Sequence, residues 1–246
     1  MNLELREFLR TTIPPYIAEF HARRYEKLGK IKLTTLLEKK NPYLYKAKNI
    51  SSGTELVRSL LDAYLISQEE TLFGTILENI AIAVTAFVHN GYKSGIEGID
   101  LEFSKDEIRY IVSIKSGPNW GNSGQQKKMI DHFNAARRIL RTSNSNVHVK
   151  AINGCCYGRS TPKNTYQEKG DYEKLCGQAF WSLISNDETL YIELIEPIGI
   201  EARSRNEEFM VKYDNITNLL AKEALNEFCL DDGSLNWPAI IEFNIK

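Results

Sequence analysis

The chain has 246 residues, 42% of them hydrophobic and 26% charged, and its formal net charge is −1. This length allows one substantial core and no linker divides the sequence, so we expect a single domain over residues 1–246. The sequence pI of about 6.5 excludes the global positive field of a histone-like protein, so any contact with nucleic acid must come from local clusters.

The ends and the cysteines indicate a reduced, cytoplasmic protein with no membrane partner. Residues 1–12 alternate charged and apolar residues and lack the basic start and apolar run of a signal peptide. No segment reaches the roughly 18 uninterrupted apolar residues that a membrane span needs. The cysteines follow neither a disulfide framework nor a zinc-ligand spacing: Cys155, Cys156, Cys176 and Cys229.

Residues 1–90 are predicted to be helical, because their apolar residues recur at three- and four-residue spacing. Two segments have the sequence of a capping box, in which a hydroxyl and a glutamate satisfy free amides at a helix start: Ser52-Gly-Thr-Glu55 and Ser67-Gln-Glu-Glu70. The second predicts the start of a long helix that ends near His89 and is closed by Gly91. Glu78 lies on this helix.

From Ile96 onward the spacing changes to two, which predicts an antiparallel hairpin with one apolar and one mostly polar face. Ile99, Leu101 and Phe103 are expected on the apolar face and Asp100 on the polar one. The alignment that places Asp100 opposite Ser113 also pairs Ile99 with Ile114, Leu101 with Val112 and Phe103 with Tyr110. Packing and polar residues therefore agree on one register.

The remaining elements predict an α/β fold with a central mixed sheet flanked by helices. A third capping box, Ser123-Gly-Gln-Gln126, begins a helix that ends near Arg141. A strand is expected at residues 147–153 and helices at residues 171–185 and 207–228, with a long polar loop at residues 158–170. Residues 1–66 then form a helical N-terminal region, residues 67–153 the core, and residues 154–246 a C-terminal helical region.

Three charged residues suit the hydrolysis of a phosphodiester. That reaction needs an activated water and positive charge near the phosphate oxygens, and a divalent metal supplies both. Magnesium prefers oxygen ligands and keeps several waters, so two carboxylates suffice, with a lysine nearby to orient water or neutralise charge. Asp100 and Lys115 lie on the polar faces of adjacent predicted strands, and Glu78 offers a second carboxylate. Without further evidence, a surface ion pair explains Asp100 and Lys115 equally well.

A wider pattern gives this set more weight. Asp100 and Ser113-Ile-Lys115 occur in the order helix, strand, strand, loop, helix, which resembles the core of the PD-(D/E)XK nucleases. The flanking motifs are similar to those of the PmeII-like type II restriction endonucleases: Asn41-Pro-Tyr-Leu-Tyr45, Lys93-Ser-Gly-Ile-Glu-Gly-Ile-Asp100, Ser113-Ile-Lys-Ser-Gly-Pro-Asn-Trp-Gly121 and Lys169-Gly-Asp-Tyr172. This resemblance runs from about His21 to Gly199. It implies a restriction-endonuclease-like fold and an enzyme that cuts specific double-stranded DNA sites with Mg²⁺.

The chain departs from the family pattern at Ser113, where the family has an acidic residue two positions before the lysine. Serine is a poor magnesium ligand, so the missing carboxylate must come from elsewhere. The candidates are Asp131 on the following helix, as in related enzymes with Ser-x-Lys, Glu102, which fits a salt bridge with Arg109 equally well, and Glu78, which we prefer. The expected catalytic residues are Asp100, Lys115, Glu78 and Ser113, and the expected metal site comprises Asp100, Glu78 and Ile114.

Candidate DNA contacts lie in two loops and on one helix. Asn119, Trp120, Asn122 and Gln125 occupy or border the glycine-rich loop after Lys115, where amides can reach base edges and Trp120 can stack, although tryptophan more often belongs to a core. Arg159 and Lys163 lie in the long polar loop, a possible DNA-recognition loop. Lys127, Asn134, Arg138 and Arg141 form a helix stripe that fits either a phosphate track or a solvated face.

The resemblance also implies partners. A palindromic DNA site has two-fold symmetry and two scissile strands, which suits a homodimer. A restriction enzyme implies a DNA methyltransferase in the same restriction–modification system. Two alternatives remain open: a repair or junction-resolving nuclease with the same core, and a catalytically inactive DNA-binding module, for which Ser113 is the best argument.

Overall fold

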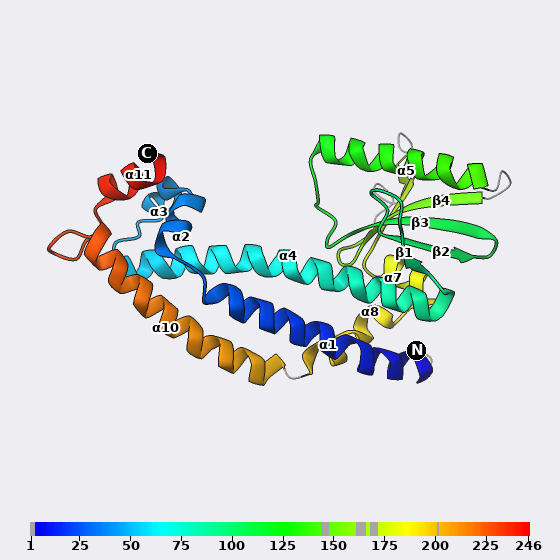
Figure 1. Ribbon diagram of the computed structural model, residues 1–246, viewed down its shortest axis with the longest axis horizontal. Coiled ribbons are helices and arrows are strands. Elements are labelled where there is room, and N and C mark those ends of the chain that lie inside the picture. Colours follow the sequence, from blue (N-terminus) through cyan, green and yellow to red (C-terminus); the bar gives the residue numbers. More distant parts are fainter. Residues whose placement is uncertain (1–2, 144–147, 161–165, 168–171, 201) are drawn as a thin grey trace. The chain divides into compact units, whose positions relative to one another are not determined.

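The computed structural model describes residues 3–143, 148–160, 166–167, 172–200 and 202–246. These residues have the expected α/β fold, in which helices flank a mixed sheet (Figure 1). The chain divides into two compact units, one of Met1–Ile17 and Phe73–Ile200 and the other of Ala18–Leu72 and Glu201–Lys246. The units interleave in sequence, because helices α1 (Leu3–Leu28) and α4 (Gly53–His89) contribute residues to both.

The first unit contains a six-stranded sheet in the order β1-β2-β3-β4-β6-β5. Its strands are β1 (Tyr92–Lys93), β2 (Leu101–Lys105), β3 (Ile108–Lys115), β4 (His148–Cys155), β5 (Tyr166–Gln167) and β6 (Tyr172–Cys176). Strands β3, β4 and β6 are parallel to one another, and the remaining pairs are antiparallel. The carboxyl ends of β3, β4 and β6 therefore meet at one edge of the sheet, which is where α/β folds commonly place a site.

The β2–β3 hairpin has the predicted register as far as the pairing extends. Leu101 lies opposite Val112 and Phe103 opposite Tyr110. Before Leu101 the pairing is offset, because Asp100 N donates to Val112 O at 2.9 Å, so Asp100 and Leu101 both meet Val112. This arrangement is a β-bulge. It shifts Ile99 to the face of Ile111, so the expectation that Ile99 shares a face with Leu101 is wrong.

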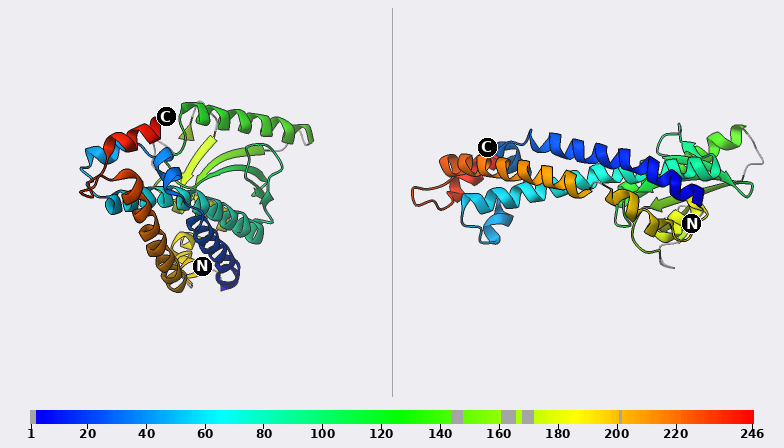
Figure 2. Two further views of the ribbon diagram at one scale, coloured as in Figure 1. Left: turned by 60° about the vertical axis from the view of Figure 1, so that its left-hand side comes forward. Right: turned by 90° about the horizontal axis from the view of Figure 1, so that it is seen from below.

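Both faces of the hairpin are covered, which corrects the prediction of one mostly polar face. On one face Ile111 and Ile99 pack against Phe133 of α5 (Ser123–Ser143). On the other, Phe103 stacks on Tyr110 and on His89 at the end of α4. Figure 1 and the left view of Figure 2 show α5 lying along its face of the sheet. The alternation was misleading because Ile111 is apolar and because Arg109 and Glu102 pair with each other on this face.

Helix α4 begins at the first predicted capping box and not at the second. Ser52 Oγ accepts a hydrogen bond from Glu55 N at 3.3 Å, while Glu55 Oε2 accepts one from Ser51 N at 3.2 Å. The helix continues through Ser67, because residues 54–66 contain no glycine or proline and most of their apolar residues are buried. It ends as predicted: Asn90 has φ 52° and Gly91 N donates to Thr85 O at 3.1 Å.

Among the described residues, one helix, α4, is sufficiently long and apolar to cross a membrane, judged by length and composition alone. Core helices pass the same test. Leu56, Val57, Leu60 and Leu61 belong to the core of the second unit, and Ile76, Ile80, Ala81 and Val84 are buried as well. The apolar composition of α4 thus has a structural explanation in packing.

The segment after residue 154 is less helical than expected. The predicted helix at residues 171–185 is wrong in its first half, because Tyr172–Cys176 forms β6 and pairs with β4 and β5. Gly177, with φ 53°, then turns the chain into α7 (Gln178–Ser185), followed by α8 (Leu190–Glu193) and α9 (Ile195–Gly199). The predicted polar loop contains β5, and its residues 161–165 and 168–170 lie outside the described residues.

The second unit is helical. Its core is built from parts of α1 and α4 together with α2 (Leu33–Lys39), α3 (Pro42–Ala47), α10 (Ala202–Phe228) and α11 (Trp237–Ile245). Arg24 stacks on the Phe209 ring, 3.4 Å from its centroid, and pairs with Glu69. The predicted helix at residues 207–228 is confirmed and begins at Ala202.

Candidate active site

Asp100 is fixed against strand β3 by its own side chain. Its Oδ2 accepts a hydrogen bond from Ile114 N at 2.6 Å and a longer one from Ser113 Oγ at 3.4 Å. Hydrogen bonds to an ionised acceptor are short and roughly twice as strong as neutral ones. The structure therefore brings together three of the predicted site residues, and the Ser113 hydroxyl faces the Asp100 carboxylate.

Lys115 is the last residue of β3 and lies two residues after Ser113, so both side chains project from the same face of the sheet. Its Nζ lies 5.3 Å from the centroid of the Trp120 ring. Among the described residues no carboxylate pairs with this ammonium group. Lys115 is thus a cation two residues from Ser113 on the same face of β3, and no carboxylate of the described residues neutralises its charge.

Asn153 connects Trp120 to strand β3. It lies opposite Ser113 in the parallel β3–β4 register, is fully buried, and donates from Nδ2 to Ser113 O at 3.2 Å. Its Oδ1 accepts from Trp120 Nε1 at 3.0 Å. Sequence reasoning missed Asn153, although an amide within the otherwise apolar end of a predicted strand was a signal that it satisfies a specific partner.

Lys174 of β6 is a second cation that the sequence did not indicate. It lies opposite Asn153 in the β4–β6 register, and its Nζ donates to Pro118 O at 2.7 Å. This bond ties the glycine-rich loop after Lys115 to the neighbouring strand. Gly158 packs against the loop from a second side. Because it has no side chain, its backbone can approach the Pro118 ring, and its φ of 99° also favours glycine.

Glu78 lies on α4, half-buried, with its Oε1 3.6 Å from Lys93 Nζ. Burial, and then the Glu78 charge, raise the pKa of the Cys156 thiol to about 12, so Glu78 also adjoins Cys156. Backbone hydrogen bonds link the surroundings of Lys93 and Cys156 to the predicted site residues. Ser94, next to Lys93, donates from N to Asp100 O at 3.2 Å, and Cys156 N donates to Lys115 O at 3.0 Å. Cys155, Cys156 and Cys176 are free, buried thiols.

The other two candidate carboxylates differ sharply in their surroundings. Glu102 is only 3% exposed, pairs with Arg109 at 2.8 Å and accepts from Ser94 Oγ at 2.6 Å. Burial lowers the pKa of Arg109, but its hydrogen bonds to Glu102 and Tyr92 outweigh burial and raise that pKa above its usual value. Glu102 is therefore a structural ion-pair residue, which was the second of the two interpretations. Asp131 is exposed on α5 and has no partner among the described residues.

The donor set suits a hard cation. Among the described residues no group of three or more His, Cys, Asp or Glu side chains is arranged around a common point. Magnesium, however, is commonly held by one or two carboxylates with water at its other positions. Asp100 and Glu78 are both partly accessible and offer oxygen atoms only, and Asp100 Oδ1 is free of contacts among the described residues. The residues present therefore fit a magnesium site of two carboxylates.

Two residues predicted to contact DNA form the helix cap of α5. Asn122 Oδ1 accepts from Gln125 N at 3.1 Å, and Gln125 Oε1 accepts from Asn122 N at 2.9 Å. This reciprocal capping box lies one residue before the predicted one, because the amide of Asn122 takes the place of the Ser123 hydroxyl. Exposed side chains are found at Asn119, Lys127, Arg138 and Arg159, while Lys163 lies outside the described residues.

Residues 5–206 match the family model of the type II restriction endonuclease EcoO109I. The chain belongs to the type II restriction endonuclease EcoO109I family. A comparison with curated proteins gave no match. The matched region contains every strand of the sheet, so the six-stranded mixed sheet with its flanking helices is a restriction-endonuclease-like fold.

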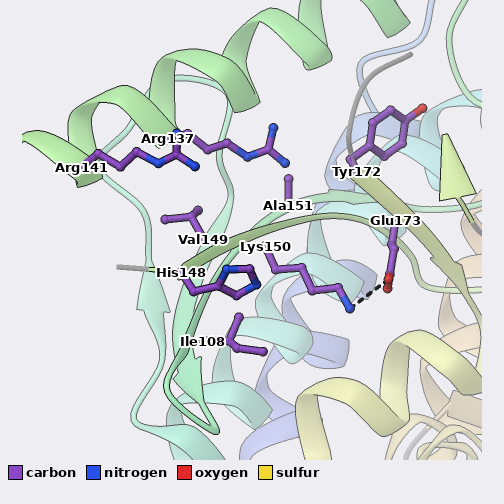
Figure 3. Close-up of a pocket in the computed structure, with 9 residues that line it drawn as sticks. All are labelled: Ile108, Arg137, Arg141, His148, Val149, Lys150, Ala151, Tyr172 and Glu173. Atoms are coloured by element: carbon purple, nitrogen blue, oxygen red, sulfur yellow. Dashed lines mark ion pairs between the residues drawn. The ribbon is translucent and has the colours of Figure 1, made fainter. Parts of the chain in front are cut away.

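This restriction-endonuclease-like sheet carries a basic pocket at its other end, seen in Figure 3. Its volume is about 300 Å³, and Arg137 and Arg141 of α5 line it together with His148 and Lys150 of β4. Strand β3 runs eight residues from Ile108 to Lys115, roughly 23 Å, so the pocket lies well away from Lys115. Arg141 therefore does not belong to the Asp100–Lys115 site.

Proposed function

We propose that this member of the EcoO109I family hydrolyses specific double-stranded DNA sites with Mg²⁺, as the likeness to the PmeII-like enzymes implies. The observation that carries the proposal is that the Asp100 carboxylate is hydrogen-bonded to Ser113 and Ile114, directly before Lys115 at the carboxyl end of β3. A bound Mg²⁺ would lower the pKa of a coordinated water and polarise the scissile phosphate. Asp100 and Glu78 are the carboxylates that would hold it, next to Ile114.

The chain's own residues have separate tasks in this reaction. The Asp100 carboxylate is oriented by Ile114 N, so its position is set before substrate binds. The Lys115 ammonium donates to the phosphate oxygens or to the attacking water, and offsets negative charge as the water oxygen bonds to phosphorus and the sugar oxygen leaves. The Ser113 hydroxyl, facing Asp100, holds the carboxylate in place and is not a metal ligand.

Exposed residues around this site supply candidate contacts with the duplex. Tyr157 is 59% exposed and its ring lies across Gly117, two residues after Lys115. Asn119, Lys127 and Arg159 are exposed as well. Such side chains suit phosphate and base-edge contacts, which position and specify a duplex respectively. We further propose a cytoplasmic homodimer that matches the two-fold symmetry of a palindromic site and functions with a DNA methyltransferase of the same system.

Digestion of plasmid and phage-sized linear DNA tests this proposal. We expect discrete fragments with Mg²⁺, no cleavage with EDTA, and duplex binding without cleavage when Ca²⁺ replaces Mg²⁺. A smear or nicks at branched DNA would indicate a repair or junction-resolving nuclease instead. Duplex binding with no cleavage in Mg²⁺ or Mn²⁺ would indicate an inactive DNA-binding module.

A further inference from the structure

Lys115 is restrained without a counter-ion. Its Nζ lies 5.3 Å from the centroid of the Trp120 ring, and no carboxylate of the described residues pairs with it. An ammonium group near an aromatic face is attracted by the negative face of the ring, which has no net charge. A carboxylate partner would compete with the substrate phosphate for this cation. The aromatic ring restricts the long lysine side chain and leaves its charge available.

The orientation of the Trp120 ring is itself fixed. Trp120 Nε1 donates to Asn153 Oδ1 at 3.0 Å, and Asn153 Nδ2 donates to Ser113 O at 3.2 Å. Asn153 is fully buried, so losing either bond would leave a buried polar group unsatisfied. Two hydrogen bonds thus connect Ser113 of β3 to Trp120 through Asn153, and the Trp120 ring in turn contacts Lys115 at the end of the same strand.

The glycine-rich loop that carries Trp120 is anchored on both sides of the ring. Lys174 Nζ holds Pro118 O at 2.7 Å, and the Asn122–Gln125 capping box begins α5 directly after the loop. The Trp120 ring also packs against the core residues beneath α5. A ring held in this way has little freedom to stack on a base, which was one of the two roles that the sequence left open.

We infer that Trp120, oriented by Asn153, is a positioning residue that holds the Lys115 ammonium for the cleavage step, and not a base-reading residue. This inference rests on the proposed function. It predicts that Trp120 affects the rate of cleavage and leaves duplex affinity unchanged.

Three variants separate the ring from the hydrogen bond. Trp120→Leu removes the aromatic face, and single-turnover cleavage in Mg²⁺ is expected to slow about tenfold, within the range of a cation–π contact. Trp120→Phe keeps a ring but loses the Nε1 donor, so its loss is expected to be smaller. Trp237→Leu is the matched control, because the Trp237 ring lies 5.4 Å from Lys46 Nζ, a similar contact within the second unit that has no part in the contacts around Lys115. It is expected to cleave at the wild-type rate.

Duplex affinity in Ca²⁺ is measured for the same proteins. Unchanged affinity together with slower cleavage by Trp120→Leu supports the inference. A wild-type cleavage rate for Trp120→Leu overturns it. A loss of affinity as large as the loss of rate also overturns it, because the ring would then contact DNA.

A readout that needs no cleavage keeps the inference separate from the proposed function. Reductive methylation with ¹³C retains the lysine charge, and the Lys115 signal, assigned with Lys115→Arg, is expected upfield through the ring current of Trp120. The shift should vanish in Trp120→Leu, remain in part in Trp120→Phe and persist in Trp237→Leu. A Lys115 signal that is the same in wild type and Trp120→Leu refutes the contact. If the wild-type protein cleaves no DNA, the proposed function fails, while an intact upfield shift would still establish that Trp120 holds Lys115.

Discussion

Replacing Asp100 by asparagine separates its two roles, in chemistry and in folding. Asparagine keeps an oxygen acceptor for the Ile114 N–H, 2.6 Å away in the wild-type structure, and removes the charge. A hydrogen bond to a charged group contributes about 1.5–3 kcal/mol and a neutral one about 1 kcal/mol, so the free energy of unfolding should fall by about 1 kcal/mol. Cleavage should slow about a hundred- to a thousandfold, because one preorganised charge is lost at the reacting phosphate.

Glu102→Gln is the matched control, since Glu102 is the next carboxylate along the chain and is bound by Arg109. Removing one partner of a buried ion pair leaves the other charge unpaired, at a cost of about 3–5 kcal/mol in the free energy of unfolding. Urea unfolding and single-turnover cleavage are measured for both proteins below their melting transitions. Asp100→Asn should lose cleavage with little loss of stability, and Glu102→Gln should show the reverse. If Glu102→Gln lost cleavage and Asp100→Asn kept it, the assignment of Asp100 to the active site would be refuted.

The remaining predictions concern the second carboxylate of the metal site, the serine and a half-buried histidine. Glu78→Gln should abolish or greatly weaken cleavage and Asp131→Asn should do less; the opposite order in the same assay would move the metal ligand to α5. Ser113→Ala should lose far less cleavage than Asp100→Asn or Lys115→Ala, and an equal loss would show that the hydroxyl is indispensable. Burial lowers the pKa of His89, so the unfolded state takes up the proton first as the pH falls through about 6.5 and the protein loses stability there. Thermal melts on either side of that pH should differ less for His89→Phe, which keeps the ring packed on Phe103; an unchanged difference would assign it to other groups.

The hairpin could be predicted from the sequence because a period of two constrains every pair at once. Leu101 with Val112 and Phe103 with Tyr110 followed from burial alone. Asp100, expected opposite Ser113, lies opposite Val112 instead and reaches Ser113 and Ile114 through its side chain. The bulge did not follow, because it depends on Ile99 meeting Phe133 of α5, a contact between segments far apart in the sequence.

Other features of the site depend on partners that no local pattern reveals. Asn153 and Trp120 are separated by more than thirty residues, and their hydrogen bond exists only once β3 and β4 have paired in parallel. The cap of α5 was predicted one residue late, since both Asn122 and Ser123 are good cap residues and the choice between them rests on Gln125. Residues Tyr172–Cys176, which form β6, were predicted to be helical. Their pairing with β4 overrides the local preference on which that prediction rested.

The bulge at Asp100 has a consequence for how the length of the chain can vary. One residue inserted or deleted between Asp100 and Lys105 would turn Leu101 and Phe103 toward α5 and carry Glu102 away from Arg109, because strand side chains alternate between faces. A change of length just before Gly98 would be absorbed by the turn between β1 and β2, while Asp100 stays bonded to Val112 and Ile114. Insertions on the N-terminal side of Asp100 can therefore alter the surroundings of the site without disturbing its chemistry, whereas insertions between Asp100 and Lys105 cannot.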